Sequence, residues 1–150
     1  MEFSQDLAYL LGLWQHCKYE KGVGIKGRAK HIFFDICQKL KLSEKFLYSK
    51  DAIYFYNYRI KKRLEKFSKE RQYRFIAIND YSANYFAGWF DCCGSINNNA
   101  VKLCNCDEVD SFILTKLNFI HELKGRSVYI IKSSAFLRFI KDYKKLNLTI

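Results

Sequence analysis

The chain has 150 residues, enough for one domain with a full core or for two small halves packed as one unit. Its 26 Lys and Arg outnumber 15 Asp and Glu, and the net charge of +11 favours a polyanion, nucleic acid first, as partner. No apolar run approaches the roughly 20 residues that cross a bilayer, so we expect no membrane partner.

The first half predicts an alternation of helices and strands. Residues 9–17 (YLLGLWQHC) form an apolar helix with a central glycine, and residues 19–30 are rich in glycine and basic side chains, so a first hairpin there is short or replaced by a loop. Residues 31–42 have apolar side chains at helical spacing. Residues 45–56 predict strand, tight turn and strand, and a basic helix follows over residues 59–67.

The second half repeats this order about 75 residues later. Its first helix, YFAGWFDCC, again has a central glycine and closes on cysteine, and asparagines mark the turn of the hairpin that follows. The expected elements are the helix over 85–93, strands over 95–98 and 100–106, a helix over 109–117, a hairpin over 119–131 and a helix over 134–144.

No Pro-rich or Gly/Ser-rich linker divides the chain. We therefore predict a single domain over residues 1–150, with repeat one at about 3–70, a linker at about 68–79 and repeat two at about 80–150. The basic segment 61–74 joins the repeats, and such charge runs are usually solvated helix faces.

Both apolar helices resemble the signature helix of the LAGLIDADG homing endonucleases. The resemblance covers nearly the whole chain in element order and is most specific in residues 85–96 (YFAGWFDCCGSI). It implies an α+β fold of tandem pseudo-twofold αββαββα repeats, a saddle, with a shortened first hairpin in repeat one. It also implies that the two helices pack side by side through Gly12 and Gly88, because glycine permits close approach of backbones.

The family carries a metal-binding carboxylate at the penultimate motif position, and here those positions are Cys17 and Cys93. Thiols match Mg²⁺ poorly, because hard cations prefer oxygen ligands. We therefore predict no catalytic residues, no metal, no cofactor and no enzyme activity. A shifted site using Asp91 and Glu20 stays open, whereas His16 is interpreted as polar filler at a helix end.

Six cysteines, at positions 17, 37, 92, 93, 104 and 106, are expected to be reduced, because no signal peptide or small loop-rich pattern accompanies them. Cys104 and Cys106, with the adjacent Cys92 and Cys93, could bind a soft metal. Cys-x-Cys lacks the usual zinc-knuckle spacing, so buried thiols acting as small apolar residues are the preferred interpretation.

Basic side chains follow the predicted strands and the helix after them. In the family the concave sheet face lies over the DNA major groove, where strand residues contact base edges. In this chain the predicted strands offer few polar side chains for such contacts. Basic residues interleaved with tyrosines suit structured RNA instead. The predicted nucleic-acid-binding residues are Lys18, Lys21, Lys26, Arg28, Lys30, Arg59, Lys61, Lys62, Arg63, Lys102, Lys124, Arg126 and Lys132, with Asn97, Asn98 and Asn99 at a hairpin tip.

Residues with AT-rich codons, such as Phe, Tyr and Lys, are abundant, and proline is absent. This bias favours an organellar genome, although an AT-rich microbe would also explain it. We expect an inactivated LAGLIDADG-derived protein in the mitochondrion that binds structured RNA, as a ribosomal component beside neighbouring proteins or as an intron maturase. The alternative is an active site-specific DNA homing endonuclease with an atypical metal site, and a third possibility is a protein that makes only protein contacts.

Overall fold

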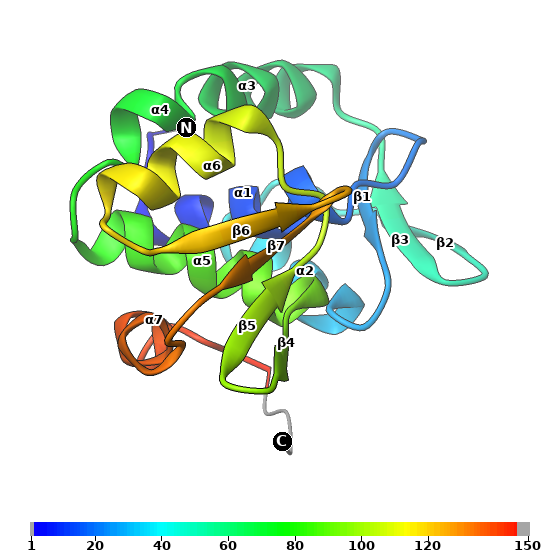
Figure 1. Cartoon of the computed structure of the whole chain (residues 1–150). Coiled ribbons are helices and arrows are strands. Elements are labelled where there is room, and N and C mark those ends of the chain that lie inside the picture. Colours follow the sequence, from blue (N-terminus) through cyan, green and yellow to red (C-terminus); the bar gives the residue numbers. More distant parts are fainter. Residues whose placement is uncertain (1, 147–150) are drawn as a thin grey trace.

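A computed structural model describes residues 2–146 of the chain, in which helices and short antiparallel strands alternate as the sequence predicts (Figure 1). The first half comprises α1 (Gln5–His16), β1 (Val23–Lys26), α2 (Lys30–Lys39), β2 (Leu47–Ser49), β3 (Ala52–Phe55) and α3 (Tyr58–Lys69). After α4 (Arg71–Arg74), the second half comprises α5 (Asp80–Cys93), β4 (Ser95–Asn97), β5 (Ala100–Leu103), α6 (Glu108–Lys116), β6 (His121–Lys124), β7 (Ser127–Ile130) and α7 (Ser134–Ile140).

The two halves form two separate antiparallel sheets, with strand orders β1-β3-β2 and β4-β5-β7-β6. The first sheet has one strand fewer because residues 18–22 contribute only the isolated bridge between Lys18 and Ile25. Gly22 there has a φ of +59°, a left-handed conformation that glycine adopts without strain. The prediction of a shortened first hairpin in an α+β fold is confirmed.

The asparagines of the second half make its first hairpin tight. Asn98 and Asn99 have φ values of 50° and 65°, and they connect the pair Asn97 and Ala100 across β4 and β5. Two consecutive left-handed residues are the requirement of a type I′ turn, and asparagine is among the residues that tolerate this conformation best. The local turn chemistry therefore sets the register of β4 and β5.

Helices α1 and α5 lie against each other through their glycines. A Cβ atom at Gly12 would collide with the backbone oxygen of Tyr85, and one at Gly88 would collide with the backbone oxygen of Tyr9. Each glycine thus faces the backbone of the opposite helix, which is the closest contact two helices can make. Most other side chains of both helices are apolar and buried, as the sequence predicts.

A single cluster of buried side chains runs through both halves. Its largest members are aromatic, and three of them, Trp14, Trp89 and Tyr85, project from the paired helices themselves. None of the helices within residues 2–146 has the length and apolar character needed to span a bilayer. The boundaries of the two repeats and of the linker stay a prediction.

A buried charged cluster joins the two halves near the end of α1. His16 Nε2 lies 2.8 Å from Asp110 Oδ2, and His16 Nδ1 lies 2.8 Å from the carbonyl oxygen of Gly12. The other oxygen of Asp110 accepts hydrogen bonds from Arg71 at 2.8 Å and from the Tyr85 hydroxyl at 2.5 Å. Both ring nitrogens of His16 thus lie within hydrogen-bond distance of oxygen atoms. One carboxylate of α6 therefore holds α1, α4 and α5 at once.

This cluster corrects two sequence-based expectations. His16, interpreted as polar filler, is buried and stacks on the Trp89 ring with centroids 3.9 Å apart. Arg71, placed in a solvated basic segment, is buried and makes a further ion pair with Asp107 at 2.6 Å. Neither prediction could succeed from local pattern, because the partners lie 94 and 36 residues away in the chain.

Replacing Gly12 tests the helix contact. We expect Gly12→Val to lower the free energy of unfolding by at least about 3 kcal/mol, the upper end of overpacking costs, because the obstacle is backbone. Urea unfolding followed by circular dichroism measures this. Gly125→Ala is the control, since Gly125 has a φ of +63° and open space around it, so only backbone strain of about 1–2 kcal/mol is added. Equal losses would contradict the close approach.

Replacing Asp110 tests the charged cluster. Burial raises the pKa of Asp110, but His16, Arg71 and the Tyr85 hydroxyl outweigh it and lower the pKa to about 2. Because the folded pKa lies below the unfolded value of about 3.9, Asp110 stabilises the fold above pH 4, and this contribution is lost as the pH falls towards 2. We expect Asp110→Asn to cost about 3–5 kcal/mol at neutral pH and to flatten the acid limb of the stability curve.

The control for Asp110 is Asp51→Asn, which removes an exposed ion pair with Lys30 and should cost less than about 1 kcal/mol. Unfolding free energies between pH 7 and pH 2 for the two variants and the parent chain provide the measurement. An Asp110→Asn variant that follows the parent curve throughout would refute the assignment.

Candidate functional site

The C-terminal ends of α1 and α5, here called the helix feet, meet at a cluster of thiols. Cys17 caps α1 and donates its amide to the Leu13 carbonyl, and Cys93 is the last residue of α5. Cys104 directly follows β5. The sulphur atoms of Cys17, Cys93 and Cys104 all lie within 4.8 Å of one another, and all three residues are half-buried. The structure brings together the two cysteines that the sequence singled out and adds a third.

Sequence reasoning considered Cys104 with Cys106, Cys92 and Cys93 as possible soft-metal ligands and preferred buried thiols, but it did not bring Cys104 together with Cys17. The chain around Cys104 is tied to the helix feet: Trp89 Nε1 donates to the Cys104 carbonyl at 2.7 Å, and Asn105 Nδ2 donates to the His16 carbonyl at 2.7 Å. Asn105 itself is left-handed, with a φ of 51°, and the chain turns there. No signal in a single sequence says which of the two cysteines this turn directs towards the helices.

Cys93 and Cys104 form a disulfide, with Cα atoms 5.8 Å apart. The expectation that all six cysteines are reduced is therefore wrong for this pair. The reason is tertiary, since the end of β5 packs against the last turn of α5 and brings two distant thiols together. The thiols of Cys17, Cys37, Cys92 and Cys106 are free.

Positive charge surrounds the free thiol at the foot of α1. Arg28 donates to the carbonyl oxygens of Phe90, Asp91 and Gly94 at 2.6–2.9 Å and so caps the C-terminus of α5. A hydrogen bond from Cys92, together with the charges of Arg28 and Lys26, lowers the pKa of Cys17 despite its burial. The lowered pKa favours the thiolate of Cys17 more than in an ordinary cysteine, and the thiolate is the form that acts as nucleophile and metal ligand.

A hard cation such as Mg²⁺ does not fit the groups at the helix feet. Thiolates are soft ligands, and the sequence-based alternative site would need Asp91 and Glu20. Asp91 is fully buried and accepts hydrogen bonds from the Tyr9 hydroxyl and from the backbone amides of Lys145 and Leu146. Within residues 2–146, the one group of three close His, Cys, Asp or Glu ligands is the thiol cluster.

The outward faces of the two sheets carry part of the predicted nucleic-acid-binding set. In the second sheet, Ser95, Lys102, Tyr129 and Glu122 lie in one cross-strand row. The ammonium groups of Lys102 and Lys124 lie 5.9 Å and 5.0 Å from the centre of the Tyr129 ring. In the first sheet, Lys26 is the exposed end of β1. These lysines lie on strands, as expected for a reading face.

The other predicted residues are more scattered. The ammonium group of Lys18 lies 3.8 Å from the centre of the Trp14 ring, and partial burial lowers the pKa of Lys18. Lys30 forms an ion pair with Asp51 at 3.3 Å, and Arg28 binds carbonyl oxygens at the end of α5. Four lie on α3, which Figure 1 shows at the top of the molecule, away from the ends of β2, β4 and β5. These four are Arg59, Lys61, Lys62 and Arg63; Lys21 precedes β1, Arg126 lies in the turn between β6 and β7, and Lys132 follows β7.

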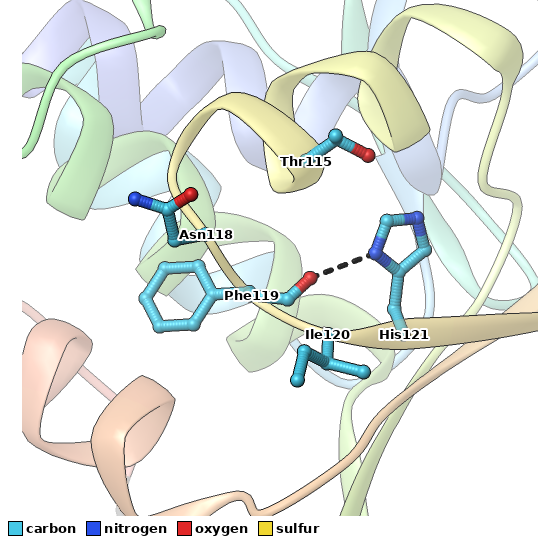
Figure 2. Close-up of a pocket in the computed structure, with 5 residues that line it drawn as sticks. All are labelled: Thr115, Asn118, Phe119, Ile120 and His121. Carbon is cyan, nitrogen blue, oxygen red and sulfur yellow. Dashed lines mark hydrogen bonds between the residues drawn. The ribbon is translucent and has the colours of Figure 1, made fainter.

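A hollow beside α6 holds no reactive constellation. It is lined by Thr115, Asn118, Phe119, Ile120 and His121, and Figure 2 shows His121 bonded to the Phe119 carbonyl. His121 Nδ1 lies 2.8 Å from that oxygen, and Nε2 lies 2.9 Å from Ser111 Oγ. Both ring nitrogens are thus used in joining α6 to β6, and the histidine has a structural role.

Comparison with solved structures identifies the fold. No family model and no curated protein sequence matches the chain. I-DmoI in complex with DNA and Mn superposes with a TM-score of 0.65, at 13% identity, over 96% of this chain and 98% of that one. This chain has the LAGLIDADG homing endonuclease fold.

Two further structures have the same LAGLIDADG fold. Mesophilic variants of the homing endonuclease I-DmoI match with a TM-score of 0.66 at 13% identity, over 97% of this chain and 98% of theirs. A variant of I-DmoI with its target DNA in the presence of Mg matches with a TM-score of 0.67 at 13% identity, over 91% and 96%. All three matches are structures of one homing endonuclease, I-DmoI, and two of them contain DNA and were solved with Mn or Mg, which contradicts the sequence-based expectation of a non-enzyme.

Removing Arg28 tests the cap on α5. We expect Arg28→Ala to lower the free energy of unfolding by about 1.5–3 kcal/mol, because three carbonyl oxygens lose a charged donor. Lys30→Ala, two residues along the same chain segment, removes only a partly exposed ion pair and should cost less than about 1 kcal/mol. Chemical unfolding compares the two variants. If Arg28→Ala is as stable as Lys30→Ala, Arg28 is free for another partner.

Proposed function

We propose that this chain is a DNA-binding endonuclease of the homing type that acts on duplex DNA with an atypical metal site. The observation that supports this most is the arrangement of two antiparallel sheets around paired helices, whose feet lie together between the two halves. I-DmoI, which has this fold, was solved with DNA and with Mn, Mg or Ca. The net charge of +11 provides the general attraction to phosphates.

Recognition of the DNA base sequence is assigned to the side chains on the outward faces of the two sheets. Lys102 and Lys124 flank Tyr129 on the second sheet, and Lys26 ends β1 on the first. Lysines can contact phosphates or the acceptor atoms of guanine in the major groove, and the tight turn at Asn98 and Asn99 presents amide groups suited to adenine. The short rows support a small number of base contacts.

Strand cleavage is assigned to the region of the helix feet. Lys18 follows the cap of α1, and Arg28 lies at the end of α5, and the presence of two cations beside the helix feet supports this assignment. Lysine and arginine there can neutralise the charge that develops on a reacting phosphate. The thiols do not suit Mg²⁺, so the metal requirement of this chain is expected to differ from that of carboxylate sites.

Structured RNA is the second candidate, and one observation favours it. Tyr48, Tyr56 and Tyr58 are 70%, 66% and 73% exposed near β2, β3 and α3, where Lys62 lies 5.3 Å over the Tyr58 ring. Exposed aromatic rings beside cations can stack on unpaired bases. In that role the chain would serve a mitochondrial ribosome or an intron, a proposal supported by this surface and by the AT-rich residue usage.

Competitive selection separates the two candidates. The full chain is offered randomised duplex DNA and randomised structured RNA, and selected duplexes are then incubated with Mg²⁺, Mn²⁺ or Zn²⁺ and examined for strand breaks. We expect duplex DNA to be enriched and cut. Each of Lys102→Ala and Lys124→Ala should weaken binding and reduce the slope of log affinity against log salt by about 1.

Tyr56→Ala and Tyr58→Ala form the matched pair on the other surface, and should leave duplex binding unchanged. Enrichment of RNA, with loss of binding in these two tyrosine variants, would replace the main proposal with the second candidate. Tight duplex binding without breaks under any of the three cations would retain the DNA partner and reject the endonuclease.

A further inference from the structure

The three cysteines at the helix feet have a property beyond the proposed function. They come from three separate elements, the cap of α1, the last residue of α5 and the residue after β5, and yet their sulphur atoms converge within 4.8 Å. A disulfide joins the sulphurs of Cys93 and Cys104, so its reduction would leave three thiols in one place. We propose that Cys17, Cys93 and Cys104, when reduced, bind a soft divalent cation, with Zn²⁺ as the expected ion.

The geometry suits a tetrahedral ion. Zinc–sulphur bonds of about 2.3 Å place the sulphur atoms of a tetrahedral site about 3.8 Å apart. The 4.8 Å limit on the present separations is close to this spacing. The Cα atoms of Cys93 and Cys104 are 5.8 Å apart, so rotation of the two side chains can separate their sulphurs without moving the backbone. Three protein ligands leave the fourth position for water or another small ligand.

The surroundings hold these ligands in place. Trp89 Nε1 holds the Cys104 carbonyl, the Asn105 side chain ties the next residue to the His16 carbonyl, and Arg28 binds the carbonyl oxygens of Phe90 and Gly94 near Cys93. Three thiolates and one Zn²⁺ have a net charge of −1. The guanidinium of Arg28 and the ammonium of Lys26 lie in the same region and offset this charge. Hydrogen bonds and charges that orient the ligands in this way strengthen metal binding.

Zn²⁺ and the disulfide compete for the same sulphur atoms. A dithiol reductant supplies two electrons and two protons to the bond between Cys93 and Cys104 and is itself oxidised to a disulfide. The two thiols so formed join the thiol of Cys17, and Zn²⁺ displaces the protons of the three groups on binding. Oxidation of the empty site restores the disulfide and leaves Cys17 as a single thiol, so the oxidised chain should not hold the ion. This inference does not depend on strand cleavage.

Cobalt titration tests the proposal on the full chain. The protein is reduced with a dithiol, and the reductant is then removed under anaerobic conditions. The reduced protein is titrated with Co²⁺ and then with Zn²⁺. We expect one equivalent of Co²⁺ with thiolate-to-cobalt charge-transfer absorption, displaced by Zn²⁺. Cys17→Ser, Cys93→Ser and Cys104→Ser should each weaken binding on the order of 100-fold or more, because each removes one of three ligands.

Cys106→Ser is the matched control, since Cys106 is a half-buried free cysteine two residues from Cys104 and should leave binding unchanged. Circular dichroism shows whether each variant remains folded. Absence of cobalt uptake by the folded, reduced chain would overturn the proposal. Equal binding by the oxidised chain, undiminished binding in folded Cys17→Ser, or equal loss in Cys106→Ser would also overturn it. Duplex binding measured on the same samples reports on the proposed function separately.

Discussion

The close contact between α1 and α5 is the constraint on which the rest of the structure depends. Gly12 and Gly88 each face backbone of the opposite helix, so the two helices are closer than any side chain would allow. The two cores then merge into one, and the sheets of the two halves attach on either side. The same contact brings the C-terminal ends of the helices together, which is why cysteines 76 residues apart in the chain become neighbours.

Much of the fold could be predicted from the sequence because its determinants are local. The glycines within apolar helices, the period of the strands and the paired asparagines of the β4–β5 turn are each visible in a short window. The candidate site is different. His16, Arg71 and Asp110 form one cluster from three distant segments, and Cys104 reaches the helix feet only because the chain turns at Asn105. No periodicity encodes such encounters, so sequence reasoning interpreted His16 as polar filler, placed Arg71 in a solvated segment, left Asp110 out and grouped Cys104 with Cys106.

The helix feet separate the geometry of a fold from the chemistry placed on it. The LAGLIDADG fold determines where two helices end, but the residues at those ends determine which ions and substrates can bind. Here the ends provide sulphur ligands and a guanidinium, while Asp91 on α5 is fully buried and its Oδ2 accepts hydrogen bonds from the Tyr9 hydroxyl and two backbone amides. The substitution of soft ligands for hard ones changes the accessible metals more than the shape of the site.

The charged cluster at His16 also makes the two halves non-interchangeable. By the 76-residue offset that relates Gly12 to Gly88, the counterpart of His16 in the second half is Cys92. A homodimer built from two copies of the second half would place a thiol where Asp110 now meets an imidazole, leaving a buried carboxylate with one strong hydrogen-bond partner fewer. One built from two copies of the first half would contain His16 without Asp110. The pseudo-twofold axis therefore relates the backbone folds of the two halves but not the residues of the charged cluster. A symmetric dimer made from either half would require these residues to be replaced.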